Sequence, residues 1–235
     1  MLNVRILTEK VTRILAQEGV VPLCRRALTH LRASRHRDAF DLEHGTETSG
    51  LEPLWKLNID SPNARYGERY EATTPQELLS VLEFLNLPVK DFSFIDLGCG
   101  KGRTLMVAAR FGFGKAIGVE FARELAATAQ ANLASQALHN ATVLQADAAE
   151  FTFPPGDKVI YMYNPFSSEV LSRVLDNLRA HKGEALYVVY KSPRCAALLD
   201  SCDFLQRHDR APGAEHIAIW QGVVPKAGLV AKGTA

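Results

Sequence analysis

The sequence predicts an α/β protein with a doubly wound, mostly parallel seven-stranded sheet, a C-terminal antiparallel hairpin and an N-terminal helical arm. Three observations support this prediction. Short apolar runs alternate with helical stretches after Asp91, a glycine-dense turn follows the first run, and the last two runs are joined by only a short connection. Strict alternation of strand and helix produces right-handed crossovers and a sheet covered on both faces.

Seven apolar runs are predicted to be strands, at residues 92–97, 116–120, 142–146, 159–163, 185–190, 204–209 and 216–220. The first five are predicted to be buried on both faces, as parallel strands are. The helical stretches between them cover residues 103–111, 123–136 and 167–181. Because residues 210–214 are too few for a helical crossover, the last two strands must pair antiparallel.

Composition and charge divide the chain into four predicted parts: a basic amphipathic arm over 1–37, a connecting segment with a helix that covers the site over 38–90, the sheet domain over 91–222 and a flexible tail over 223–235. Residues 36–70 are polar and rich in turn residues, which predicts little regular structure. A helix then begins at Pro75, with Thr74 as its N-cap and Glu77 completing a capping box.

The arm contains eight basic and two acidic side chains, whereas the rest of the chain has 19 basic and 24 acidic ones. Either the helical arm packs on its own core and leaves a solvated basic face, or it contacts anionic lipid at the membrane periphery, nucleic acid or a partner. The sequence contains no run of 18 apolar residues, so no membrane span is expected. The four cysteines form no CxxC pair and no export segment is present, which favours reduced thiols and a cytoplasmic protein.

The seven histidines have no metal-ligand spacing, so the sequence predicts no metal site. No sequence feature bears on the oligomeric state. Nucleic acid is the less favoured partner, because few aromatic residues accompany the basic arm and the remainder is mildly acidic.

The glycine turn is the main candidate for ligand binding. Asp96 ends the first strand, and Gly98, Gly100 and Gly102 follow at alternate positions. Glycines allow positive φ and remove side chains, so that a ligand can approach the backbone at the start of the next helix. Glu120 closes the second strand and can accept two hydrogen bonds from the hydroxyls of a ribose. Alternatively, Glu120 is a solvated acid that caps the following helix.

Two cofactor classes compete for this turn. A nicotinamide dinucleotide favours a third glycine where this chain has Arg103, and Asp96 would repel its pyrophosphate. S-adenosylmethionine (SAM) has no phosphate and carries a sulfonium and an ammonium group. Asp96 and Glu120 therefore favour SAM.

At these residues the chain resembles the class I SAM-dependent methyltransferases, whose first motif is an acid followed by Gly-x-Gly-x-Gly after one residue. The resemblance covers roughly residues 91–221 and includes the final hairpin. It implies that Asp96 and the glycine turn hold the methionine part of SAM and that Glu120 holds the ribose. It also implies that Asp147 binds the adenine amine, with an N-cap on the following turn as the alternative role.

Upstream, residues 70–75 resemble a Tyr-x-Pro-Ser/Thr motif of the seven-strand protein lysine methyltransferases, with Ala72 in place of the proline. This resemblance implies that Tyr70 and Thr73 lie over the cofactor. It gives some support for a protein substrate.

The methyl acceptor is expected at the end of the fourth strand, at Tyr163, Asn164, Pro165 and Phe166. Carbonyl oxygens of Asn164 and Pro165 could accept hydrogen bonds from an amine, and Phe166 could stack on it. The segment is similar to the Asn-Pro-Pro-Phe/Tyr motif of amino-methyltransferases. Alternatively, it is an Asn-Pro turn with Phe166 in the core.

A general base is needed only for a protonated acceptor. The candidates are Tyr161, Tyr163, Glu47 and Asp147, and the sequence does not choose among them. Lys191 and Arg194 could contact an acidic substrate, although a solvated surface position is favoured for both.

These residues favour a SAM-dependent methyltransferase that acts on a protein or small molecule, with an amine as one acceptor. An NAD(P)-dependent oxidoreductase with an unusual glycine turn is one alternative. A non-catalytic module that binds the cofactor or a partner is another.

Overall fold

The computed structural model describes Thr8, Thr12 and residues 37–181 and 185–223. The predicted basic arm and the predicted tail therefore lie outside the described residues, apart from Thr8, Thr12, Arg37 and Val223.

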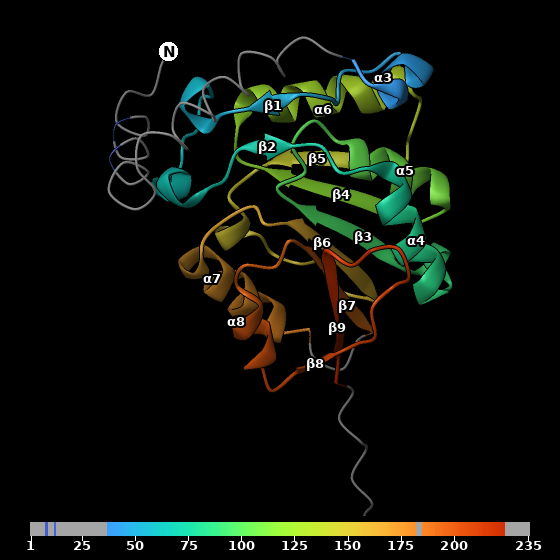
Figure 1. Cartoon of the computed structure of the whole chain (residues 1–235), viewed down its shortest axis with the longest axis vertical. Coiled ribbons are helices and arrows are strands. Elements are labelled where there is room, and N and C mark those ends of the chain that lie inside the picture. Colours follow the sequence, from blue (N-terminus) through green and yellow to red (C-terminus); the bar gives the residue numbers. More distant parts are fainter. Residues whose placement is uncertain (1–7, 9–11, 13–36, 182–184, 224–235) are drawn as a thin grey trace, which may run out of the picture.

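A seven-stranded sheet forms the centre of the molecule, with the strand order β5-β4-β3-β6-β7-β9-β8 (Figure 1). Its strands are β3 (Ser93–Leu97), β4 (Lys115–Glu120), β5 (Ala141–Gln145), β6 (Lys158–Tyr163), β7 (Leu186–Lys191), β8 (Leu205–Arg207) and β9 (Ile217–Gly222). The strands from β3 to β7 pair in parallel, and β9 pairs antiparallel with both β7 and β8. The predicted fold class is confirmed.

Helices cover both faces of this sheet (Figure 1). One face packs against α4 (Pro75–Leu85), α5 (Arg103–Phe111) and α6 (Arg123–Ser135). The other packs against α7 (Ser168–Arg179) and α8 (Ala196–Asp200). Neighbouring residues of β3 point to opposite faces, because side chains alternate along a strand: Phe94 belongs to the first core and Ile95 to the second.

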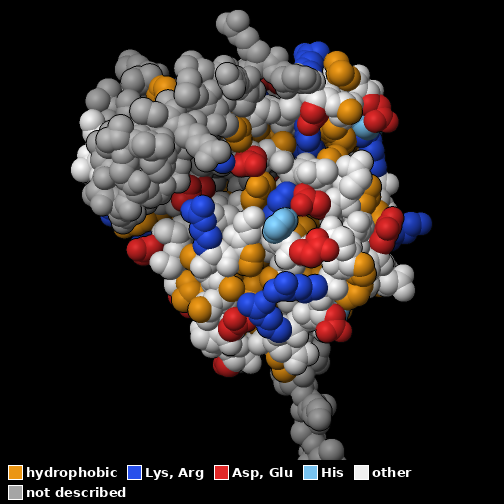
Figure 2. Space-filling model, viewed as in Figure 1, with side chains coloured by type: hydrophobic (Ala, Val, Ile, Leu, Met, Phe, Trp, Pro, Cys, Tyr) orange, Lys and Arg blue, Asp and Glu red, His pale blue; other side chains and the backbone are white. Residues whose placement is uncertain are grey.

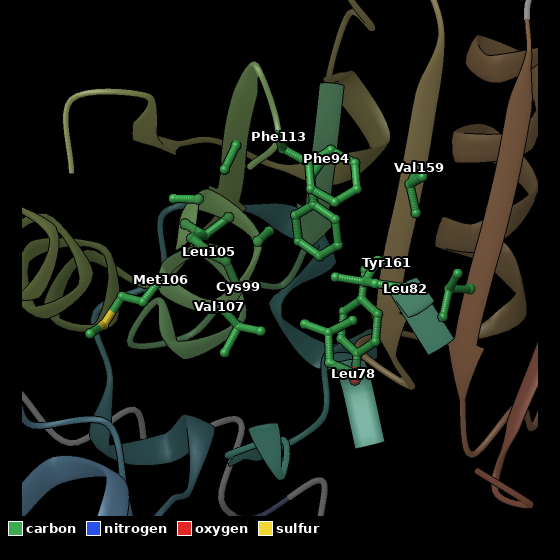
Figure 3. Packing of buried hydrophobic residues seen from close by; sticks show 14 of the residues in the cluster. Leu78, Leu82, Phe94, Cys99, Leu105, Met106, Val107, Phe113, Val159 and Tyr161 are labelled. Carbon is green, nitrogen blue, oxygen red and sulfur yellow. The ribbon is translucent and has the colours of Figure 1, made fainter. Parts of the chain in front are cut away.

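Aromatic packing joins α4 to the centre of the sheet. Figure 3 shows Phe94 beside Phe113, with Leu78 and Leu82 of α4 near Tyr161 of β6. The ring centroid of Phe94 lies 5.4 Å from that of Phe113 and 6.1 Å from that of Tyr161. The segment that precedes the sheet is therefore anchored in the same core as the strands that carry the candidate site.

The prediction of little regular structure over 36–70 was wrong. This part contains a short helix, two 3-10 turns and a two-stranded sheet: α3 (Ala39–His44), β1 (Leu51–Glu52), η1 (Leu54–Lys56), η2 (Pro62–Tyr66) and β2 (Tyr70–Glu71). Each element is too short for hydrophobic periodicity to reveal it.

Asp41 shows how this part is held together. Its buried carboxylate accepts hydrogen bonds from the backbone N–H of Thr48 at 2.8 Å and of Ser49 at 2.7 Å, and also from both hydroxyls. Thr46 Oγ1 donates another at 2.9 Å. Burial alone would raise the pKa of Asp41, but the hydrogen bonds from Ser49 and Thr48 outweigh it and lower the pKa to about 2. The buried, charged Asp41 carboxylate therefore holds this segment together through hydrogen bonds, where a longer segment would use a large apolar core.

The start of α4 agrees only in part with its prediction. Thr74 is the N-cap and Pro75 the first helical residue, as predicted. The capping box was wrong, because the Thr74 side chain makes no capping hydrogen bond and the Glu77 carboxylate pairs with Lys191. Glu77 therefore pairs with Lys191 of β7 and does not bond to the backbone N–H of Thr74 as a capping box requires.

Candidate functional site

The glycine turn lies at the carboxyl edge of the sheet, between β3 and α5. Gly98, Gly100 and Gly102 have φ values of 85°, 54° and 84°, in the left-handed region that favours glycine. Gly102 is the N-cap of α5. The sequence correctly indicated a turn that needs glycine at these positions.

Side chains of the protein itself fill the space beside the glycines. A Cβ at Gly100 would lie 2.1 Å from Cε2 of Tyr70, and one at Gly98 would lie 2.7 Å from Cβ of Pro165. The turn, Tyr70 and Pro165 are therefore brought together, although they come from separate parts of the sequence. Tyr70 is held there because its hydroxyl donates to the carbonyl of Thr48.

Two carboxylates flank the turn from inside. Asp96 and Glu120 are each only 3% exposed. Asp96 accepts a hydrogen bond from Thr104, whereas Glu120 accepts one from the backbone N–H of Gly100 and one from that of Ala122, both at 2.9 Å. The alternative in which Glu120 is a solvated acid was wrong, because Glu120, the last residue of β4, is buried. The contact with the next helix is present, since Ala122 is the N-cap of α6.

Burial raises the pKa of both carboxyls. The pKa of Asp96 rises to about 7 because of burial, and the negative charge of Glu120 adds to the rise against the hydrogen bond from Thr104. Burial also raises the pKa of Glu120 to about 7 against its backbone hydrogen bonds. Within the described part of the chain, no basic side chain forms an ion pair with either group. The site therefore has buried negative charge without a counter-charge.

Asp147 follows β5 at the same edge. It is the N-cap of η4 (Ala148–Glu150), where its Oδ1 accepts from the N–H of Ala149 at 2.9 Å. Its Oδ2 accepts from Nδ2 of Asn63 at 2.8 Å and from the hydroxyl of Ser61. The N-cap role, which was the alternative for Asp147, is therefore present. The contacts with Ser61 and Asn63 were not expected from the sequence.

Thr73 and Tyr161 form a buried pair, and Tyr161 lies close enough to Asp96 to interact with its charge. Thr73 Oγ1 lies 2.8 Å from the hydroxyl of Tyr161. Burial raises the pKa of Tyr161 well above its ordinary value, so the phenol is neutral. Tyr161 is thus unsuited to accept a proton near neutral pH.

The loop after β6 contains the candidate acceptor residues. Asn164 has a φ of 40°, and its Oδ1 accepts from the hydroxyl of Tyr190 at 3.2 Å. The carbonyl of Pro165 accepts from the N–H of Glu68 at 3.0 Å. Phe166 packs in the core, 8% exposed. The structure therefore has the Asn-Pro turn with Phe166 in the core, and both carbonyls have partners within the protein.

Tyr163 lies half-buried at the rim. Burial and the nearby Glu71 carboxylate raise the pKa of Tyr163 to about 12. The ammonium of Lys191 lies 4.5 Å from the centroid of the Tyr163 ring and forms an ion pair with Glu77. The expectation of a solvated Lys191 was wrong, since it is buried, whereas Arg194 is exposed.

Two basic residues of the turn fasten the segment that precedes the sheet. Arg103 donates from Nε to Oγ1 of Thr48 at 2.7 Å, and its Nη2 lies 2.7 Å from an oxygen of Asp38. Lys101 Nζ lies 3.2 Å from a carboxylate oxygen of Glu47. Sequence reasoning missed these roles. The feature of the sequence that could have indicated them is a pair of basic residues at the glycine turn, one within it and one directly after it.

Residues 58–68, called the strap below, cross the carboxyl edge of the sheet. At one end Ile59 forms an antiparallel bridge with Ala122, after β4. At the other end Gly67 forms one with Phe166, after β6. Since Asp147 binds the middle of the strap, this segment connects the loops that follow three parallel strands.

The described surface has mixed charge. In Figure 2, acidic and basic side chains are interspersed over the described part of the visible face. Within residues 37–181 and 185–223, no group of three or more His, Cys, Asp or Glu side chains is arranged to hold a metal ion. No helix among the described residues has the length and apolar character needed to cross a bilayer.

Comparison with known proteins identifies the central part of the chain. Residues 94–181 match the family model of a methyltransferase domain. No curated protein matches the sequence. The solved structure of the yhhF protein of Escherichia coli is 18% identical with a TM-score of 0.52, and the match covers 74% of this chain and 99% of that one. This likeness supports the fold.

Two further solved structures are similar at lower scores. The StiE O-MT structure is 18% identical with a TM-score of 0.45, covering 57% of this chain and 53% of that one. The magnesium protoporphyrin IX methyltransferase of Synechocystis, solved with bound SAM, is 18% identical with a TM-score of 0.47, covering 63% of this chain and 78% of that one. The chain thus spans about half the length of the StiE structure.

The two raised pKa values predict how stability depends on pH without a ligand. A carboxyl whose folded-state pKa lies above its unfolded value of about 4 stabilises the fold at low pH, and this contribution is lost as the pH rises through the folded pKa. We expect the free energy of unfolding, measured with urea, to fall between about pH 4.5 and pH 7. Asp96→Asn should roughly halve this fall.

The exposed Asp209 provides a matched control. Asp209→Asn should leave the pH dependence unchanged. An equally steep fall in Asp96→Asn would show that Asp96 does not titrate in this range.

Proposed function

We propose that this chain, of which residues 94–181 match a methyltransferase-domain family model, transfers a methyl group from SAM to an amine acceptor at the end of β6. The observation on which the donor half rests is the pair of buried carboxylates, Asp96 and Glu120, beside the glycine turn. Their negative charge suits a cofactor that carries an ammonium and a sulfonium. Their oxygens also suit the hydroxyl donors of a ribose.

The residues present fit this cofactor. In the proposal Asp96 and the turn bind the methionine part, Glu120 binds the ribose and Asp147 binds the adenine amine, while Tyr70 covers the turn. When bound, SAM supplies an already activated methyl group. The protein then contributes mainly by positioning the acceptor, which can lower a barrier by about 7–11 kcal/mol.

Acidic residues around the loop after β6 favour a cationic acceptor. Glu68 is fixed to Pro165 by its backbone, Glu71 is hydrogen bonded to Tyr163, and Glu77 pairs with Lys191. Glu68 is the last residue of the strap, Glu71 belongs to β2 and Glu77 to the first turn of α4. Glu68 and Glu71 form exposed ion pairs with Arg194 and Arg69. Exposed ion pairs contribute little, so a protonated amine can replace either cation at this rim.

A protonated amine must lose a proton before it can attack the methyl group. Tyr163, with a pKa of about 12, is itself protonated at neutral pH. Glu47 is paired with Lys101. Glu71 pairs with Arg69, but that pair is exposed. In the proposal Glu71 accepts the proton, directly or through Tyr163, because it is the carboxylate in contact with that phenol.

A dinucleotide fits the same site less well. Its pyrophosphate would lie beside Asp96 and Glu120, and Arg103 is already engaged by Asp38 and Thr48. Like charges placed together in a buried site are unfavourable.

Substitution of Glu120 tests the donor half. We expect Glu120→Ala to weaken SAM binding by about 2–4 kcal/mol, since hydrogen bonds to a charged group contribute about 1.5–3 kcal/mol each. Titration calorimetry measures this change, with the exposed Glu150→Ala as the control. Unchanged affinity in Glu120→Ala would remove Glu120 from the site, and no binding of SAM by the unaltered chain would overturn the proposal.

Transfer of labelled methyl from SAM into a cell extract tests the acceptor half. We expect labelling to fall at least about tenfold in Asn164→Ala, with SAM affinity retained, because Asn164 lies at the acceptor end and not at the turn. Separation of the extract identifies whether protein, small molecules or nucleic acid carry the label. A non-catalytic module would give no labelling with either chain, and equal labelling by both would exclude a role for Asn164.

A further inference from the structure

The strap supplies two donors to a single carboxylate oxygen. Ser61 is the N-cap of η2, and its Oγ accepts from the N–H of Asn63 at 3.0 Å while donating to Oδ2 of Asp147. Asn63 is buried and donates from Nδ2 to the same oxygen at 2.8 Å. Because Oγ already accepts from the backbone, the one hydroxyl hydrogen of Ser61 is directed at Asp147.

The number of acceptor positions on Asp147 determines what else it can bind. A carboxylate offers about four lone-pair positions, two on each oxygen. Ser61 and Asn63 occupy both positions of Oδ2, and the N–H of Ala149 occupies one of Oδ1. One position therefore remains, on Oδ1.

We propose that Ser61 and Asn63 are positioning residues that make Asp147 selective for adenine. With Oδ2 saturated, the carboxylate cannot rotate without losing donors, and it presents a single acceptor position to the nucleobase. The exocyclic amine of adenine donates to that position. Hypoxanthine has a carbonyl oxygen in the same place, which also accepts, so two acceptors would face each other. The inference rests on the proposed function and adds the residues that control its nucleobase specificity.

Asp147 is half-buried without a ligand, and a nucleobase placed against it would exclude water from the remaining acceptor position. A mismatch between two buried acceptors leaves both without a donor, and an unsatisfied buried polar group costs more than a hydrogen bond contributes. A carboxylate free to turn could relieve the mismatch by rotating away from the ligand and accepting hydrogen bonds from water instead. The strap donors prevent this rotation, so their removal should weaken discrimination more than it weakens binding.

The test compares S-adenosylhomocysteine with S-inosylhomocysteine by titration calorimetry on the full chain. We expect the unaltered chain to favour the adenine ligand, and Ser61→Ala and Asn63→Ala each to reduce that preference about tenfold. Ser61→Thr keeps a hydroxyl and should restore it. Asn58→Ala is the matched control, because Asn58 lies in the same strap but bonds to Glu124. It should leave the preference unchanged.

Three results would overturn the inference. The first is an unchanged preference in both alanine variants, which would mean that the strap is only structural. The second is tighter binding of both ligands in the variants, which would mean that the strap competes with the nucleobase. The third is a loss of preference for the adenine ligand in Asn58→Ala as large as that in Ser61→Ala and Asn63→Ala. Failure of the unaltered chain to bind S-adenosylhomocysteine would instead overturn the proposed function, and this inference with it.

Discussion

Two buried carboxylates without a cation beside them are the constraint on which the candidate site depends. Asp96 and Glu120 end neighbouring parallel strands, so the sheet itself places them together, and their burial raises both pKa values to about 7. Burying negative charge in this way opposes folding of the ligand-free chain. The arrangement is understandable if a ligand with positive charge and hydroxyl donors completes it. In the proposed function that ligand is SAM.

The segment before the sheet completes the site from the opposite side. Arg103 and Lys101 bind Asp38, Thr48 and Glu47 of the preceding segment, and neither forms an ion pair with Asp96 or Glu120. Tyr70 then lies on Gly100. The same glycines that would admit a cofactor therefore also admit this covering segment. The backbone of the glycine turn is thus the surface against which both Tyr70 and the proposed cofactor would lie, because glycine has no side chain to block either.

The sheet domain was predictable because its strands and helices are long enough to show their periodicity. The strands β3 to β7 and the helices α5 to α7 lie within two residues of the predicted bounds. The segment over 36–70 was not predictable, since buried polar contacts between residues distant in the sequence hold it, as around Asp41. The turn and its acids could be located from the sequence. The partners of Asp147 and Lys191 could not, because hydrogen bonds between distant segments leave no periodic signal.

The most direct test of this account is the proton balance of cofactor binding. If a cationic cofactor binds to Asp96 and Glu120, it lowers their pKa values, and carboxyls that are partly protonated near pH 7 must release protons. Calorimetry of SAM binding at pH 7, in buffers of different ionisation enthalpy, measures this release. The account predicts a net release of protons that diminishes in Asp96→Asn, with affinity rising as the pH increases from 6 to 8. Binding with no proton release, at an affinity independent of pH, would contradict it.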